Sequence, residues 1–169
     1  MTTDTVTELF DLTEQLCAIP SVSGSEQALA DFVEQWLRDH AHALTIERLA
    51  DNVVARPLGS DAAAGRDGAP RIVLGGHLDT VPANENLTPR RDGATLHGLG
   101  SADMKGGLAI MLRLARRLAQ DPARHDVTFV FYEGEEVADE HNGLRFLFAE
   151  HPELVAGDLA ILLEPTGGW

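Results

Sequence analysis

The stretch over residues 71–82, Arg-Ile-Val-Leu-Gly-Gly-His-Leu-Asp-Thr-Val-Pro, constrains the fold of this chain most strongly. Its apolar run, Ile72 to Leu74, is typical of a buried strand, and the glycine pair that follows allows the backbone to leave a sheet. His77 and Asp79 come two residues apart, so their side chains point the same way in extended backbone. Open α/β sheets bind ligands just beyond the carboxyl ends of their strands. We therefore expect a functional site at this point of the chain.

Segments with helical and with strand periodicity alternate along the chain, and this alternation predicts an α/β fold with a mainly parallel central sheet. The run Ser23-Gly24-Ser25-Glu26 has the pattern of a capping box, so a helix is expected to follow it and to end at His40. Two further helices are predicted over residues 5–18 and about 143–150. The predicted strands span residues 44–49, 52–56, 71–76, 95–97, 126–132 and 159–163. A surface loop is expected over residues 59–70 and polar turns over residues 83–93.

Composition and charge exclude several classes of partner. A chain of 169 residues with 44% hydrophobic and 24% charged residues is sufficient for one domain with a core. Its net charge of −14 argues against nucleic acids and anionic membranes, because both attract clusters of Lys and Arg. The single cysteine, Cys17, is expected in the core, excludes an internal disulfide and is typical of a reducing compartment. No segment approaches the length of a membrane span and no signal peptide is recognisable, so we expect a cytoplasmic protein.

The glycine-rich run from Gly98 to Gly107 matches neither template for nucleotide binding. The dinucleotide-binding fingerprint needs a third glycine where Asp103 stands, and a P-loop needs Gly-Lys-Ser/Thr where this chain has Met-Lys-Gly. A carboxylate also has the wrong charge for a phosphate. Asp103 is instead expected to begin a helix, whose apolar positions recur on one face.

Acidic and imidazole side chains follow three of the predicted strands. His77 and Asp79 follow one strand, the adjacent pair Glu135-Glu136 follows another, and Glu164 follows the last. The carboxyl ends of parallel strands meet at one edge of a sheet, so these groups and Asp103 are expected to converge in one cleft.

So many carboxylates in one cleft would repel one another unless divalent cations were bound between them. One histidine with several carboxylates suits Zn²⁺, with Co²⁺ or Mn²⁺ as alternatives. Of two adjacent glutamates, one can bind metal while the other acts as a general base. The residues alone also allow a different interpretation, in which His77 is a satisfied histidine at a strand end and each carboxylate is a solvated charge. That interpretation is the one we adopt for Glu133 and Glu140.

Four motifs in this order resemble those of the M20 family of dinuclear zinc amidohydrolases and peptidases. They are His-Leu-Asp-Thr-Val-Pro at 77–82, Gly-Ser-Ala-Asp-Met-Lys-Gly at 100–106, Glu-Glu at 135–136 and Glu-Pro-Thr at 164–166. Within that family, the sequences of these motifs are most similar to those of the succinyl-diaminopimelate desuccinylases. The resemblance implies a three-layer, zinc-peptidase-like catalytic domain and two bound Zn²⁺ ions.

The resemblance also implies a role for each residue of the motifs. His77 and Glu164 would bind the first metal, Asp103 would bridge both metals, and Glu136 would bind the second. Glu135 would act as general base, and Asp79 would hold the imidazole of His77 in its metal-binding tautomer. A cis peptide bond between Asp103 and Met104 is a further expectation of the family.

Family members are longer than this chain, and the resemblance implies that residues 1–169 are the N-terminal part of the catalytic domain. The lid (dimerisation) domain and the C-terminal part of the catalytic domain, with a histidine ligand of the second metal, would be absent. We therefore expect a fold that is incomplete on its C-terminal side, an exposed apolar sheet edge, and a homodimer only for the full-length protein.

The function that the resemblance implies is hydrolysis of a small-molecule N-acyl amino acid, the amide of N-succinyl-LL-2,6-diaminopimelate. Two alternatives stay open: another M20 deacylase or peptidase, such as one that acts on N-acetylornithine, and a non-catalytic metal-binding fragment.

Overall fold

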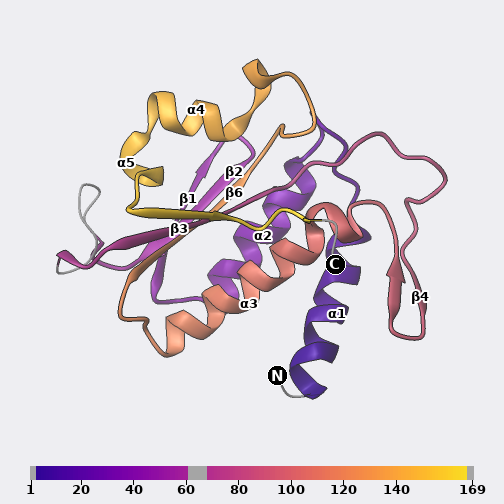
Figure 1. Ribbon diagram of the computed structural model, residues 1–169, viewed down its shortest axis with the longest axis horizontal. Helices are drawn as coiled ribbons and strands as arrows, with labels where there is room; N and C mark the ends of the chain where they lie inside the picture. The colour runs from indigo at the N-terminus through magenta and orange to yellow at the C-terminus, as the bar shows by residue number, and fades with distance from the viewer. Residues whose placement is uncertain (1–2, 61–67, 167–169) are drawn as a thin grey trace.

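The computed structural model describes residues 3–60 and 68–166. Its main strands are Leu44–Leu49 (β1), Asn52–Pro57 (β2), Arg71–His77 (β3), Asp126–Tyr132 (β6) and Leu159–Leu162 (β7). They form one sheet in the spatial order β1-β2-β6-β3-β7 (Figure 1). β3 pairs in parallel with β6 and β7, whereas β2 pairs antiparallel with β6 and β1, so every strand except β2 runs in the same direction. The α/β class with a mainly parallel sheet is confirmed.

Helices cover both faces of this sheet and produce three layers (Figure 1). The first face carries Thr3–Cys17 (α1), Gln27–His40 (α2) and Gly106–Gln120 (α3), and the second carries Gly143–Glu150 (α4) and Pro152–Val155 (α5). Successive residues of β6 enter the two cores in turn, because side chains alternate between the faces of a strand. Phe129 and Phe131 pack with the first group of helices, and Val130 and Tyr132 pack with the second. Cys17 is buried, as expected.

The register of the sheet determines where the site can form. His77, the last residue of β3, lies opposite Tyr132, the last residue of β6. Leu162 of β7 lies opposite Gly75 of β3, so the residues just after β7 approach the same edge. The segments that follow β3, β6 and β7 therefore leave the sheet side by side.

The starts of two helices differ from the sequence prediction. The predicted capping box is wrong: α2 begins at Gln27, and the side chain of Glu26 makes no capping hydrogen bond to it. The Ser23 hydroxyl donates instead to Asp79, so its oxygen is engaged outside the helix. Asp103 lies in a wide turn over Ser101–Lys105 (η2) and has extended backbone angles (φ −123°, ψ 98°), so the regular helix α3 begins only at Gly106. The peptide bond between Asp103 and Met104 is cis, as the resemblance implied.

A two-stranded hairpin and a short 3-10 helix lie outside the main sheet. Arg90–Asp92 (β4) pairs antiparallel with Thr95–His97 (β5), and Asp139–His141 (η3) is one turn of 3-10 helix before α4. The sequence predicts β5 but not β4, because the three residues of β4 are exposed and polar and show no apolar alternation. The loop expected over 59–70 lies in part, at 61–67, outside the described residues.

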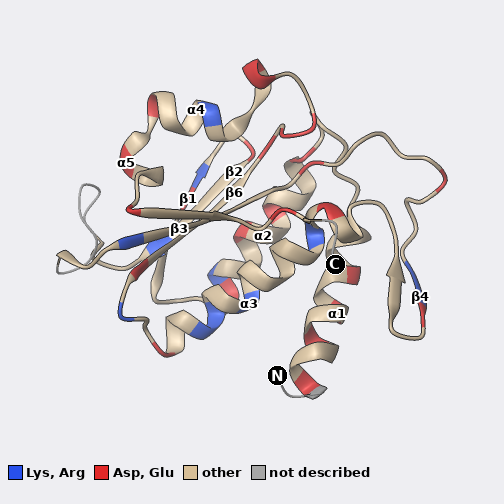
Figure 2. Ribbon diagram, viewed as in Figure 1, with Lys and Arg blue, Asp and Glu red and all other residues tan. Residues whose placement is uncertain are grey.

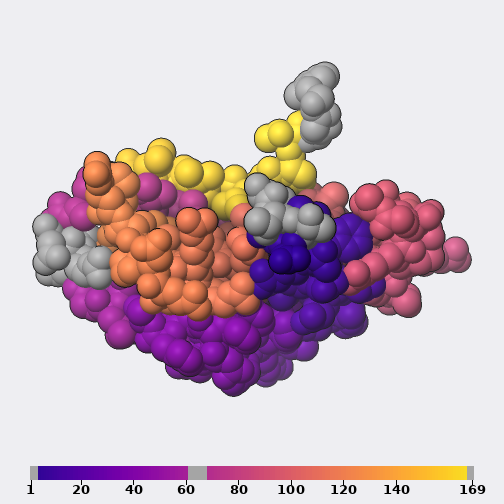
Figure 3. Space-filling model, turned by 90° about the horizontal axis from the view of Figure 1, so that it is seen from below, coloured from indigo at the N-terminus to yellow at the C-terminus, as the bar shows by residue number. Residues whose placement is uncertain are grey.

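The outer edge of the sheet is apolar and exposed, as expected. β7 pairs with β3 on one side, and within the described part of the chain no strand pairs with its other side. Its side chains Leu159, Ile161 and Leu162 are each about half exposed, and Figure 3 shows this yellow segment at the margin of the molecule. An edge of this kind is available for further pairing.

Charged residues are distributed unevenly over the fold. Lys and Arg recur along α3, whereas Asp and Glu occur on the loops near the carboxyl ends of the strands (Figure 2). Arg113 and Arg116 of α3 pair with Glu8 of α1 and so fasten these two helices together. Of the helices that the structure describes, none is long and apolar enough to cross a membrane.

We expect Phe129→Ala to lower the free energy of unfolding by about 3–5 kcal/mol, because Phe129 is fully buried between the sheet and the α1–α3 layer. Phe148→Ala is the matched control: this phenylalanine is 54% exposed, so its truncation should change stability by only about 0.5 kcal/mol. Urea denaturation of both variants measures the difference. Equal losses in the two variants would contradict the layer arrangement.

Candidate metal centre

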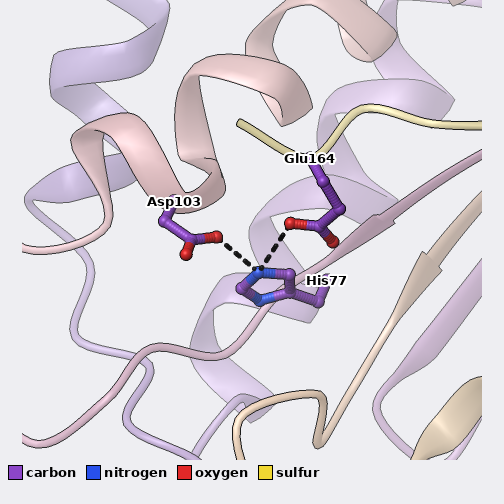
Figure 4. Close-up of side chains that lie close together, drawn as sticks. All are labelled: His77, Asp103 and Glu164. Carbon is purple, nitrogen blue, oxygen red and sulfur yellow. Dashed lines mark hydrogen bonds and ion pairs between the residues drawn. The ribbon is translucent and has the colours of Figure 1, made fainter. Parts of the chain in front are cut away.

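The site is built around His77, the last residue of β3, whose side chain is only 1% exposed. Its Nε2 atom lies 2.9 Å from Oδ1 of Asp103 and 3.8 Å from Oε2 of Glu164 (Figure 4). One ligand atom from each of these three side chains lies within 4.8 Å of the others. A strand end, the turn η2 and the segment after β7 thus direct three potential ligands at one point.

The other ring nitrogen of His77 faces Asp79. Nδ1 lies 2.9 Å from the backbone oxygen of Asp79 and 3.4 Å from its carboxylate Oδ1. A proton on Nδ1 is therefore donated to Asp79, and this leaves Nε2 as the atom that can bind a cation. Burial alone would lower the pKa of His77, but the carboxylates of Asp79 and Asp103 outweigh it and raise the pKa to about 9.

Asp79 is completely buried and holds a second segment of the site in place. Its two oxygens accept hydrogen bonds from the backbone N–H groups of Glu135 and Glu136, each at 2.9 Å, and from the Ser23 hydroxyl at 2.7 Å. Burial would raise the pKa of Asp79, but the hydrogen bonds from His77, Ser23 and the two amides lower it to about 2. The carboxylate therefore stays ionised.

Glu135 and Glu136 lie close to the same imidazole. Together with His77 they form a second group whose potential ligand atoms lie within 4.8 Å of one another. Glu135 is exposed and Glu136 is partly buried. Burial, followed by the negative charge of Asp103, raises the pKa of Glu136. The structure therefore brings together all six residues that the sequence singles out.

Asp103 is directed at the imidazole because both neighbours that follow it are anchored in the interior. Met104 is completely buried, and its sulfur lies 3.1 Å from the backbone nitrogen of His77. Lys105 is 2% exposed, and its Nζ donates to the carbonyl oxygens of Leu16 (3.1 Å) and Ile19 (2.8 Å) at the end of α1. The turn η2 is thus fastened to both the sheet and α1.

The donor set fits a divalent cation. Oε1 of Glu164 is buried and, within the described part of the chain, has no hydrogen-bond partner. A buried carboxylate oxygen without a donor is costly, and a cation beside it would remove that cost. Burial and the neighbouring carboxylates raise the pKa of Glu164, which shows the same crowding of negative charge. One imidazole with several carboxylates is a ligand set that zinc accepts.

Glu133 is not the solvated charge that the sequence predicts. It is partly buried, and its carboxylate accepts hydrogen bonds from the Asn52 side chain (2.7 Å) and the Asp51 backbone N–H (3.3 Å). Burial raises its pKa. The prediction is wrong because β2 lies next to β6 and carries Asn52 to this loop. Glu140, by contrast, is exposed, as expected.

Two buried residues, one beside the imidazole and one beside the loop that carries Glu135, do not figure in the predicted site. The ring of Tyr132 packs edge-on against His77 with 6.3 Å between ring centroids, and Tyr132 is 3% exposed. Glu26 is 2% exposed and accepts a hydrogen bond from the backbone of Gly134. The position of Tyr132 at the end of the most apolar strand is the sequence signal that could place it at the site. No such signal exists for Glu26, because the local sequence favours a capping box.

Comparison with known proteins gives consistent matches. The profile of Peptidase family M20/M25/M40 matches residues 73–169. The chain is 44% identical to a succinyl-diaminopimelate desuccinylase of Corynebacterium glutamicum over 94% of its own length and 42% of the relative. It is 28% identical to an acetylornithine deacetylase of Proteus mirabilis, over 92% of the chain and 42% of the relative. A tripeptidase structure from Staphylococcus aureus superposes with a TM-score of 0.72 at 21% identity, over 96% of this chain and 44% of that one. The chain thus spans less than half the length of these proteins.

We expect the stability of the metal-free chain to depend on the protonation of His77. The pKa of His77 is raised in the fold from 6.5 to about 9, so the folded state binds this proton more tightly than the unfolded chain does. The resulting stabilisation is complete below about pH 6.5 and is lost as the pH rises to about 9.

The measurement compares urea denaturation of the wild-type chain and His77→Gln across that range, with a chelator present. The difference in the free energy of unfolding should shrink as the pH rises. Burial lowers the pKa of Lys105 to about 8, which has the opposite effect on stability, but Lys105 is present in both proteins and cancels in the difference. A difference that is independent of pH would show that His77 is not held as the structure indicates.

Proposed function

The chain belongs to peptidase family M20/M25/M40, a family of metal-dependent hydrolases, and from this premise we propose that it carries the metal centre of an amide hydrolase. The proposed reaction converts N-succinyl-LL-2,6-diaminopimelate and water to succinate and LL-2,6-diaminopimelate. The observation that supports it best is the convergence of Asp103 and Glu164 on Nε2 of His77. The 44% identity to the desuccinylase of C. glutamicum supports this choice of substrate.

We propose that His77, Asp103 and Glu164 bind one Zn²⁺ ion and that Asp103 and Glu136 contribute to a second. Co²⁺ or Mn²⁺ would suit the same oxygen and nitrogen ligands. A metal bound here would supply Lewis acidity for the amide carbonyl and for the attacking water. Asp79 would keep Nδ1 of His77 protonated, so that Nε2 faces the metal.

Glu135 is proposed as the general base. Its side chain is exposed beside the imidazole, while its backbone N–H is held by the buried Asp79, so the carboxylate is free to reach a substrate from a fixed position. It would accept a proton from the attacking water and deliver it to the amide nitrogen as the carbon–nitrogen bond breaks. The second proton of the water passes from the new carboxyl group to the amine, so the products are a carboxylate and an ammonium group, and Glu135 ends the cycle as it began.

We also propose where this chain belongs within the whole protein, in metabolism and in the cell. Residues 1–169 would form the N-terminal part of the catalytic domain of a longer protein, and a dimer would involve that longer protein. The substrate would be a small N-acyl amino acid in lysine and diaminopimelate biosynthesis. We propose a cytoplasmic location, in keeping with the free and buried thiol of Cys17.

Another deacylase activity of the family is the second candidate, and the similarity to an acetylornithine deacetylase supports it. Parallel assays of the zinc-loaded protein with N-succinyl-LL-2,6-diaminopimelate and with N-acetylornithine separate the two activities. Faster turnover of the succinyl substrate supports the proposal, and faster turnover of N-acetylornithine contradicts it. Turnover of neither substrate, with one tightly bound ion per chain, favours a non-catalytic metal-binding fragment.

We expect Glu135→Gln to retain metal binding while turnover falls by about 10²–10⁴-fold, the usual contribution of a general base. The glutamine keeps the size of the side chain but cannot accept the proton. Glu140→Gln is the matched control, because Glu140 is an exposed glutamate and should leave turnover unchanged. Near-normal turnover by the Glu135→Gln protein would remove Glu135 from the role.

A further inference from the structure

The loop after β6 is held by an unusual series of hydrogen bonds. Residues 133–136 form neither helix nor strand, so their backbone N–H groups need acceptors from elsewhere. All four N–H groups donate to side chains of other segments. The donations run from Glu133 to Asn52 Oδ1 (3.1 Å), from Gly134 to Glu26 Oε1 (3.2 Å), and from Glu135 and Glu136 to Asp79 Oδ1 and Oδ2 (2.9 Å each).

The three acceptor residues, Glu26, Asn52 and Asp79, are all buried. Their exposures are 2%, 0% and 0%. Buried carboxylates and amides are stable only when they are hydrogen-bonded, so each acceptor depends on the loop as much as the loop depends on it. Asp79 already belongs to the site through His77. Among the described residues, Glu26 has no hydrogen bond or ion pair with His77, so its bond to Gly134 calls for another explanation.

Glu26 does not act as a cap for its own helix. It immediately precedes α2, but its side chain makes no hydrogen bond to the first turn of that helix. Its backbone oxygen accepts from Leu29 and Ala30, so the helix can begin without the carboxylate. The carboxylate instead reaches a loop that is 108 residues further along the chain.

Gly134, the residue that Glu26 holds, has little freedom to lie elsewhere. Its φ of +67° is in the left-handed region, and a Cβ atom there would lie 2.3 Å from the carbonyl oxygen of His141. The neighbouring carbonyl of Glu133 accepts from the N–H of Gly143 at 2.8 Å. The loop is therefore enclosed on one side by the segment before α4 and on the other by Glu26.

We propose that Glu26 is a positioning residue, which fixes the loop at Gly134 and thereby holds Glu135 and Glu136 toward the imidazole of His77 before any metal binds. Asp79 fixes the two glutamates from the side of β3, and Glu26 fixes the residue before them from the side of α2. The effect of Glu26 on metal binding and catalysis rests on the proposed function, but its effect on the position of the loop does not depend on that function.

The test uses Glu26→Met, which preserves the length of the side chain and removes both acceptor oxygens, and Glu26→Gln, whose amide oxygen can still accept from Gly134. Gln27→Ala is the matched control, because Gln27 is the exposed neighbour on the same turn. Hydrogen exchange of the amides of residues 134–136 is measured by NMR in the metal-free chain, and the affinity for Zn²⁺ is measured by titration.

In Glu26→Met, we expect exchange at Gly134 to be at least about tenfold faster, as for the loss of a hydrogen bond to a charged group. We expect the affinity for zinc to fall by about 10- to 100-fold, as for loss of an outer-shell partner. Glu26→Gln should restore most of both, and Gln27→Ala should change neither. A folded Glu26→Met chain with wild-type exchange at residues 134–136 would overturn the proposal.

The wild-type chain provides a test that does not depend on the folding of a variant. The amide of Gly134 should exchange as slowly as amides of the core, and exchange at the rate of an exposed loop would also overturn the proposal. If Glu26→Met releases the loop in a chain whose wild type binds no zinc, the positioning role is supported and the proposed function is contradicted. The two hypotheses therefore fail in different experiments.

Discussion

Repulsion among carboxylates around one buried imidazole is the constraint on which the rest of this structure depends. Asp103, Glu136 and Glu164 crowd around His77, and the pKa values of the two glutamates are raised by burial and by neighbouring negative charge. Burial would lower the pKa of His77, but Asp79 and Asp103 raise it to about 9, so without a cation the imidazolium supplies positive charge at the centre of the cluster. A divalent metal would take over that function and would also satisfy the buried oxygen of Glu164.

The fold makes this crowding possible because the surrounding elements are rigid. The register of β3 with β6 and β7 brings three chain segments to one edge of the sheet, and the core on both faces of β6 keeps that edge in place. Lys105 anchors the turn that carries Asp103, and Asp79 anchors the loop that carries the glutamate pair. The turn that carries Asp103 and the loop that carries Glu135 and Glu136 are thus each held by a buried group that is not itself a proposed metal ligand.

The sequence predicts the sheet and most of the residues around His77, because Asp79, Glu135, Glu136 and Glu164 follow strongly apolar strands and strand ends converge in an α/β fold. It does not predict the surroundings of Glu26 and Glu133, which depend on partners far away in the chain. The run Ser23-Gly24-Ser25-Glu26 matches a capping box, yet Ser23 and Glu26 bind the segments after β3 and β6. A local pattern cannot reveal such contacts, because the same side-chain oxygens suit a nearby or a distant backbone N–H equally well. Asp103 shows the same limit, since its extended backbone depends on the burial of Met104 and Lys105.

The most direct test of the account is a crystal structure of the chain grown with zinc, with anomalous scattering measured at the zinc absorption edge. The account predicts a peak at about 2.0–2.2 Å from Nε2 of His77 and from carboxylate oxygens of Asp103 and Glu164, the usual range for zinc ligands. Saturating zinc with no peak at this point, and Nε2 of His77 still hydrogen-bonded to Asp103, would contradict it.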